Sequence, residues 1–156
     1  MDVTTLLGQT VPEILSAITG SKVTPVEEPQ AFWEERDEPA LTAMSGLRGD
    51  VNGILALRCD RRTAIKLFER VVVGHAQANE ENVRDLLAEI LNLVIGQIKA
   101  GLLFQGKEVR HSLPSVLSEE GESELYGFES EPPLILDSDL GRFEVHFVPM
   151  EEYESP

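Results

Sequence analysis

A long, largely apolar segment with a narrow polar stripe constrains the fold of this chain more than any other feature. The segment from Glu80 to Phe104 reads EENVRDLLAEILNLVIGQIKAGLLF. In a helix each residue advances about 100° around the axis, so residues three and four apart share a face. Nearly all the other residues from Leu86 to Leu103 are aliphatic, which predicts a helix buried over most of its girth. The polar stripe covers roughly 80° of that helix and consists of Asp85, Glu89, Asn92, Gly96 and Lys99.

The rest of the chain predicts an α+β fold, a mostly antiparallel sheet with long helices packed on it. Strands come in neighbouring pairs, without the regular alternation of strand and helix that builds parallel sheets. Pro12 marks a helix start or a kink, Gly20 and Gly74 are expected to end helices, and Asp60 is an expected N-cap. The expected helices are Val3–Thr19, Arg61–Val73, and a long one from Glu80 or Asn82 to Gly101 or Gly106.

Two hairpins and one extended segment supply most of the expected strands. Gly49-Asp50 is a turn signal inside the first hairpin, and Gly53 indicates a bulge or a close approach. In the last strand, apolar and polar residues alternate from Arg142 to Phe147, which predicts one buried face and one solvent face. The expected strands are Leu41–Gly49, Val51–Arg58, Val109–Leu117 (interrupted by Pro114), Leu125–Phe128, Pro133–Asp137 and Arg142–Val148, with a short strand and a loop in Ser21–Pro39 and an acidic loop in Ser118–Ser123.

The charge balance is strongly acidic. The chain has 28 acidic and 13 basic residues, a net charge of −15. Because phosphate contacts need clustered Lys and Arg, this balance argues against nucleic acid as a partner. Of the acids, 12 fall between Glu119 and Pro156, where Arg142 is the one base; they form either a solubilising surface or one that steers a basic partner. The length of 156 residues predicts one domain over residues 1–150, followed by a flexible acidic tail at 151–156.

Cysteine usage and hydropathy indicate a cytoplasmic protein. Cys59 is the single cysteine, so no internal disulfide forms, and its place at the end of an apolar run predicts a buried thiol and not a nucleophile. The N-terminus lacks the basic start and apolar run of a signal peptide. No stretch of about 18 consecutive apolar residues is present, so we expect no membrane span.

Common catalytic and metal-binding signatures are absent from the sequence. There is no G-x-S-x-G elbow, P-loop or G-x-G-x-x-G motif. His75, His111 and His146 have no metal-ligand spacing. The segment Asp137–Asp139 resembles the start of a calcium loop, but Gly141 comes one position early and no Glu follows at the right distance, which favours a hairpin turn. We expect no metal ligand in this chain.

The polar stripe is either the solvent-facing edge of a core helix or a functional surface. The carboxamide of Asn92 donates and accepts hydrogen bonds but has no proton to give up, so it cannot be a general base. It can orient a water towards an electrophile that is already activated, a role that an amide serves in phosphoryl transfer. Glu89, one turn earlier, is too negative to approach a phosphoryl oxygen and is better suited to pair with a cation on a partner.

The stripe resembles the active-site helix of the CheC, CheX and FliY phosphatases of bacterial chemotaxis, most closely CheX. The likeness rests on the pattern D-x-x-x-E-x-x-N-x-x-x-G-x-x-K from Asp85 to Lys99. It extends to GDVNGILAL before the second helix, HSLPSVL after the long helix, and GRFEVHF near the C-terminus. The first helix, with PEILSAITG, lacks a Glu-x-x-Asn pair, which agrees with the single site of CheX and not with the two sites of CheC.

The resemblance implies a CheC-like fold and hydrolysis of the aspartyl phosphate of a CheY-type response regulator. By the family pattern, Asn92 positions the attacking water and Glu89 pairs with the lysine of the receiver domain, while Asp85, Gly96 and Lys99 belong to the partner-binding surface. The chain itself needs no cofactor, because Mg²⁺ is expected on the receiver. The resemblance also implies a homodimer. The alternative is a non-catalytic receiver-binding or flagellar-switch-like interaction module.

Overall fold

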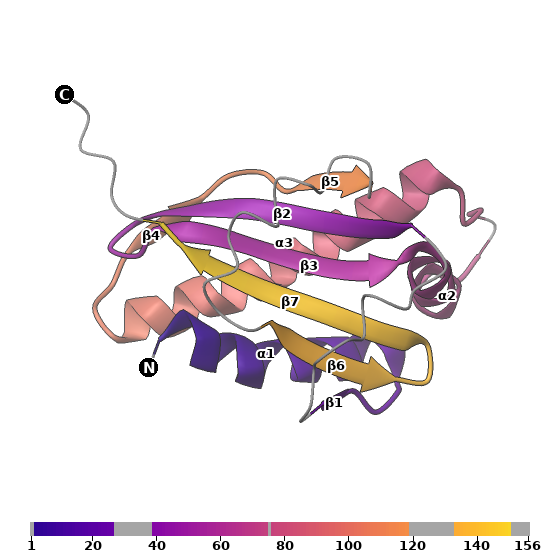
Figure 1. Cartoon of the computed structure of the whole chain (residues 1–156), viewed down its shortest axis with the longest axis horizontal. Coiled ribbons are helices and arrows are strands. Elements are labelled where there is room, and N and C mark those ends of the chain that lie inside the picture. Colours follow the sequence, from indigo (N-terminus) through magenta and orange to yellow (C-terminus); the bar gives the residue numbers. More distant parts are fainter. Residues whose placement is uncertain (1, 27–38, 75, 119–132, 151–156) are drawn as a thin grey trace.

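A single antiparallel sheet organises the structure, a computed structural model that describes residues 2–26, 39–74, 76–118 and 133–150. The strand order is β1-β6-β7-β3-β2, and the free edge of β2 pairs with β4 over one half and with β5 over the other (Figure 1). This sheet and its helices confirm the expected α+β fold. The strands are β1 (Thr24–Pro25), β2 (Ala40–Gly49), β3 (Gly53–Asp60), β4 (Val109–His111), β5 (Ser115–Ser118), β6 (Leu134–Ser138) and β7 (Gly141–Pro149).

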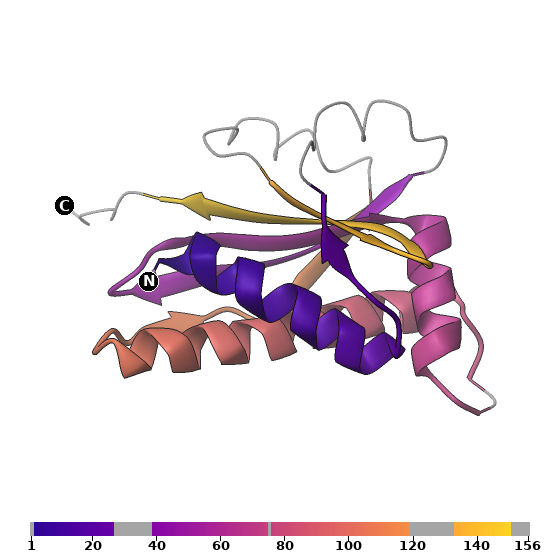
Figure 2. The same cartoon turned by 90° about the horizontal axis from the view of Figure 1, so that it is seen from below.

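The described helices lie on one side of this sheet (Figure 2). They are α1 (Val3–Thr19), α2 (Arg61–Val71) and α3 (Glu80–Phe104). Two run along the face of the sheet, and the other, α2, stands at its end. At each N-terminus a polar side chain accepts a hydrogen bond from a backbone N–H that the helix leaves unpaired. These caps are Asp2 to Thr5, Asp60 to Thr63 and Asn79 to Asn82, at 2.8, 2.7 and 2.8 Å. Gly20 ends α1 with a positive φ of 68°, as expected of a helix-ending glycine.

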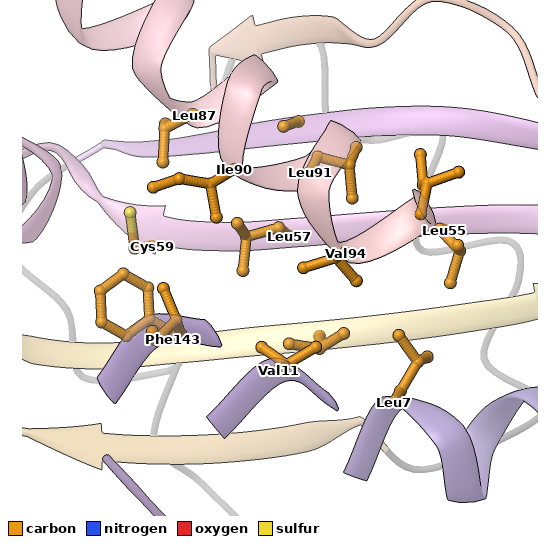
Figure 3. Close-up of a cluster of buried hydrophobic side chains, with 14 of the residues drawn as sticks. Leu7, Val11, Leu55, Leu57, Cys59, Leu87, Ile90, Leu91, Val94 and Phe143 are labelled. Atoms are coloured by element: carbon orange, nitrogen blue, oxygen red, sulfur yellow. The ribbon is translucent and has the colours of Figure 1, made fainter. Parts of the chain in front are cut away.

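The hydrophobic core lies between the helices and the sheet. The cluster brings together Leu7 and Val11 of α1, Leu55 and Leu57 of β3, and Phe143 of β7 (Figure 3). Burying an aliphatic or aromatic side chain of this size contributes about 1.5–3 kcal/mol. The side of α3 that supplies the largest share of the cluster contains Val83, Leu87, Ile90, Leu91, Val94, Ile95, Ile98 and Leu102.

Some local predictions were wrong by a few residues. α1 has the predicted bounds, Val3–Thr19, but Pro12 inside it marks no helix start, because Asp2 supplies the cap. Gly101 lies inside α3 instead of ending it, and a Cβ there would lie 2.9 Å from Leu6 of α1, so this glycine permits close helix packing. α2 ends at Val71, two residues before the expected end. β3 begins at Gly53, where a Cβ would lie 2.5 Å from the Phe147 ring, which confirms the predicted close approach.

The sheet face opposite the helices is less exposed than the alternation in β7 predicted. Glu144 was expected to point into solvent, but it is only 3% exposed. Its cross-strand neighbour is Arg58, which is 5% exposed, and it also contacts His146 on the same strand. Cationic groups beside a carboxylate offset part of the cost of its burial, although Oε2 of Glu144 has no hydrogen-bond partner among the described residues. The polar alternation of β7 therefore did not mean solvent exposure.

The sequence has no uninterrupted apolar run long enough to span a membrane, yet α3 as a whole is strongly apolar. By length and composition alone, this helix could cross a membrane, with a mean hydropathy of 1.6. A helix that covers a sheet meets the same criterion, because its inward side must be apolar. The expected strand at Leu125–Phe128, the acidic loop beyond Ser118 and the tail at 151–156 lie outside the described residues.

Candidate functional site

The structure places all five stripe residues on one side of α3, opposite its buried side. Asp85, Glu89 and Gly96 are exposed, whereas Asn92 and Lys99 are half-buried. The helical spacing therefore predicted their common face correctly. The stripe is neither part of the core nor uniformly solvated, since Asn92 and Lys99 are partly covered and Lys99 reaches β4.

Two contacts fix this side of α3 along the edge strands of the sheet. Arg84 Nη1 donates a hydrogen bond to the backbone oxygen of Val116 in β5, at 3.2 Å. Two turns beyond Asn92, Lys99 Nζ lies 3.3 Å from His111 Nδ1 in β4. Burial, and then the positive charge of Lys99, lower the pKa of His111, so its ring is neutral near pH 7 and Nδ1 accepts from the ammonium group.

Asn92 has an unsatisfied polar atom. Its Oδ1 is buried, and among the residues that the structure describes nothing donates a hydrogen bond to it. Leaving a buried acceptor without a partner costs about 1–3 kcal/mol, so such an atom calls for an explanation. If the side chain turned Oδ1 to the surface, a water bound between this carboxamide and a substrate would satisfy it.

Gly96 leaves the surface beside Asn92 open. A Cβ built on Gly96 would have no heavy atom within 4 Å, in contrast to Gly101 further along the same helix. The glycine therefore has no packing role within this chain. In the middle of a helix, glycine is less favourable than alanine by about 0.8–1 kcal/mol, so its presence here needs a reason outside the fold.

Apolar and basic side chains flank the C-terminal half of the stripe. Leu93 and Leu103 are 51% and 59% exposed. Arg48, Lys107 and Arg110 surround Lys99 in a pocket at the end of the helix. The sequence analysis missed these three basic residues, because no spacing along the chain connects them; the pairing of β2 with β4 brings them together.

Metal binding and cysteine chemistry have no support in the described ranges. No group of three His, Cys, Asp or Glu side chains could hold a metal ion there. Cys59 is fully buried, as predicted, and burial raises the pKa of its thiol far above the usual range. The chemistry open to this surface is therefore recognition, charge pairing and the positioning of a water.

Comparison with protein-family models identifies the relatives of this fold. Residues 41–139 match the family described as "Chemotaxis phosphatase CheX". The chain belongs to the CheX family. The matched range contains the whole of α3 and therefore all five stripe residues. Comparison with curated protein sequences gives no match.

Solved structures support the CheX fold at low sequence identity. Chemotaxis protein CheX from Vibrio vulnificus is 19% identical, with a TM-score of 0.72 and coverage of 95% of both chains. A putative chemotaxis protein from Desulfovibrio vulgaris Hildenborough is also 19% identical, with a TM-score of 0.71 and coverage of 96% of this chain and 97% of the other. The CheX chain in a CheX–CheY–BeF3–Mg²⁺ complex from Borrelia burgdorferi is 16% identical, with a TM-score of 0.69 and coverage of 96% and 99%.

Proposed function

We propose that this protein is a cytoplasmic phosphatase that hydrolyses the aspartyl phosphate of a CheY-type response regulator. Membership in a family described as chemotaxis phosphatases supports this activity. The CheX–CheY complex of a structural relative, which also contains Mg²⁺, supports a receiver domain as the partner. The single observation that carries the proposal to this chain is the buried, unpartnered Oδ1 of Asn92 on an otherwise accessible stripe.

In the proposed mechanism, Asn92 orients the attacking water. The side chain turns Oδ1 towards the surface, where it accepts a hydrogen bond from the water. This contact satisfies the acceptor and points the water oxygen at phosphorus, in line with the scissile bond. The water oxygen bonds to phosphorus, the bond from phosphorus to the aspartyl oxygen breaks, and the aspartate carboxylate leaves. The products are the unmodified aspartate side chain of the receiver and inorganic phosphate. The proton of the water passes to phosphate or solvent. When bound to the receiver, Mg²⁺ would supply positive charge that neutralises the phosphoryl group.

Glu89 has a docking role in this proposal. It is exposed one turn from Asn92, and no ion pair within the described part of the chain occupies it. A charge-assisted contact with the receiver lysine would hold the phosphoryl group in register with the amide. Asp85, Gly96 and Lys99 complete the partner-binding face. We further propose a single CheX-like domain over residues 1–150 that acts as a homodimer.

Phosphate release from phosphorylated CheY-type receivers tests this proposal. Removing a positioning group costs on the order of 100-fold in rate, so Asn92→Ala should lower turnover by that factor while receiver binding persists. Glu89→Ala should weaken binding as well. Gln97→Ala is the matched control, because Gln97 is exposed on the same helix but outside the stripe; it should behave like the native protein.

Two outcomes would contradict parts of the proposal. If Asn92→Ala keeps a tenth or more of native activity, the carboxamide does not position the water. If the native protein binds receivers without shortening the lifetime of their phosphate, the chain is a non-catalytic receiver-binding or flagellar-switch-like module. Sedimentation of the purified protein tests the homodimer, and a monomer at micromolar concentration would contradict it.

A further inference from the structure

A pocket of about 580 Å³ lies at the C-terminal end of the stripe. Three segments line it: α3 with Lys99, Ala100 and Leu103, the end of β2 with its turn, and the residues that lead into β4. Figure 1 shows these segments meeting at the left, where α3 ends and the chain turns into β4. Because Lys99 belongs to both the stripe and the pocket, the two form one continuous surface.

The pocket is basic, although the chain as a whole carries a net charge of −15. Two acidic residues, Asp50 and Glu108, also line it. One of them is already engaged, since Asp50 Oδ2 accepts a hydrogen bond from the backbone N–H of Glu108 at 2.7 Å. The four basic residues of the pocket, out of 13 in the chain, are Arg48, Lys99, Lys107 and Arg110.

These four side chains are not neutralised by ion pairs in residues 2–26, 39–74, 76–118 and 133–150. The one polar side-chain partner found for them there is the neutral ring of His111, which accepts from Lys99. Several arginines elsewhere on the described surface do form ion pairs with carboxylates. They include Arg61 with Glu80, Arg70 with Asp139, Arg84 with Glu80 and Arg142 with Asp137.

Two of the pocket arginines face each other across the sheet. Arg48 of β2 and Arg110 of β4 are directly opposite in the antiparallel register, and both are exposed. Like charges in this arrangement destabilise a strand pair. A sequence usually breaks such a local rule where function requires it. The arrangement concentrates positive charge at the mouth of the pocket before any partner arrives.

We propose that this pocket binds an acidic segment of the receiver's surface while Asn92 acts on the phosphate. The inference rests on the proposed function, because the stripe defines where the receiver sits. A protein surface fits better than a small anion, since the exposed Leu103 and Ala100 adjoin the charged groups, as apolar and polar areas adjoin in protein interfaces. The pocket supplies local attraction on a protein that would otherwise repel an acidic partner.

Steady-state dephosphorylation at low and high salt tests the pocket with matched variants. Charge reversal in Lys107→Glu and Arg110→Glu should each raise KM for the phosphorylated receiver roughly tenfold at low salt and flatten its salt dependence, with kcat retained. Lys66→Glu is the control, because Lys66 is an exposed lysine of α2 outside the pocket and undergoes the same change in charge. It should leave KM close to the native value.

A stability measurement separates docking from folding. Arg110→Thr removes the like-charge pair with Arg48 and should raise the thermal midpoint while still raising KM. A variant that failed merely through misfolding would lower the midpoint instead. This opposite movement of stability and binding is the result expected of a docking residue.

Three outcomes would overturn the inference: native KM in both charge reversals, an equal rise in KM for Lys66→Glu, or tight binding of inorganic phosphate alone that competes with the receiver. Failure of the proposed function looks different. If no receiver loses phosphate faster, titration of the receiver itself against the same variants still tests the pocket. If Asn92→Ala stays active while KM rises in the charge reversals, the water-positioning role fails and the pocket stands.

Discussion

Substitution of Gly96 tests whether the residue at this position of α3 serves the stability of the fold or the binding of a partner. A Cβ at this position would meet no heavy atom within 4 Å, so alanine adds no crowding. In the middle of a helix, Gly→Ala gains about 0.8–1 kcal/mol from helix propensity. For a chain of this length, that gain corresponds to a rise of roughly 2–4 °C in the thermal midpoint. Gly96→Gln should stabilise the fold to a similar extent, because glutamine is also a good helix former.

The same substitutions should impair docking in proportion to their size. If Gly96 lets the receiver approach the helix backbone, Gly96→Gln places a long side chain in that space and should weaken binding at least roughly tenfold, or about 1.4 kcal/mol. Gly96→Ala should have a smaller effect. Thermal unfolding and titration with a phosphorylated receiver measure the two quantities separately.

Gly101→Ala is the matched control for this reasoning. Its Cβ would lie 2.9 Å from a methyl carbon of Leu6, so crowding in the core offsets the gain in helix propensity. This variant should be no more stable than the native protein. A drop in stability for Gly96→Ala, or native receiver binding by Gly96→Gln, would refute the view that Gly96 keeps a docking surface clear.

Three further predictions follow from local chemistry. The Cys59 thiol, whose pKa is raised by burial, should react with a thiol reagent at pH 8 only after unfolding in guanidinium; reaction of the folded protein within minutes would contradict this. The pKa of His111 is lowered below 6.5 in the fold, first by burial and then by Lys99. The unfolded chain therefore takes up the proton first, so the stability contributed by His111 is complete above pH 6.5 and is lost as pH falls towards the folded pKa. Denaturant titrations between pH 7.5 and 5.5 should show a smaller loss for His111→Gln than for the native protein. Asp60→Ala should lower the free energy of unfolding by about 1 kcal/mol through loss of the α2 cap, while Asp60→Asn keeps most of it; equal stability of both variants would count against the cap.

The candidate site was predictable because it lies on one helix. Asp85, Glu89, Asn92, Gly96 and Lys99 share a face through helical period alone, and the structure confirms that face. Helix caps behave in the same way, since the Asp60 side chain bonds to an N–H three residues away. Interactions of such short range are encoded by neighbouring residues, whatever the rest of the chain does.

Burial on the second face of the sheet was not predictable in this way. Alternation in β7 correctly gave two faces but not their solvent exposure, because Glu144 is covered and lies opposite Arg58 on β3. Pro12 shows that one local signal can mislead even where the predicted bounds are right. Helix Val3–Thr19 forms as predicted, but its proline marks no helix start, because the cap at Asp2 and the burial of Val3, Leu6 and Leu7 begin α1 before it.

The sequence by itself thus determined the helical and strand periods, the helix caps and the stripe with its carboxamide. The tertiary structure alone decided that Oδ1 of Asn92 is buried without a partner and that a basic pocket adjoins Lys99. Arg48 and Arg110 are 62 positions apart in the sequence and become neighbours through the pairing of β2 with β4. The physical reason is the separation along the sequence over which interactions act. Local periodicity determines which way a side chain points, whereas its surroundings depend on distant segments that meet only when the sheet forms.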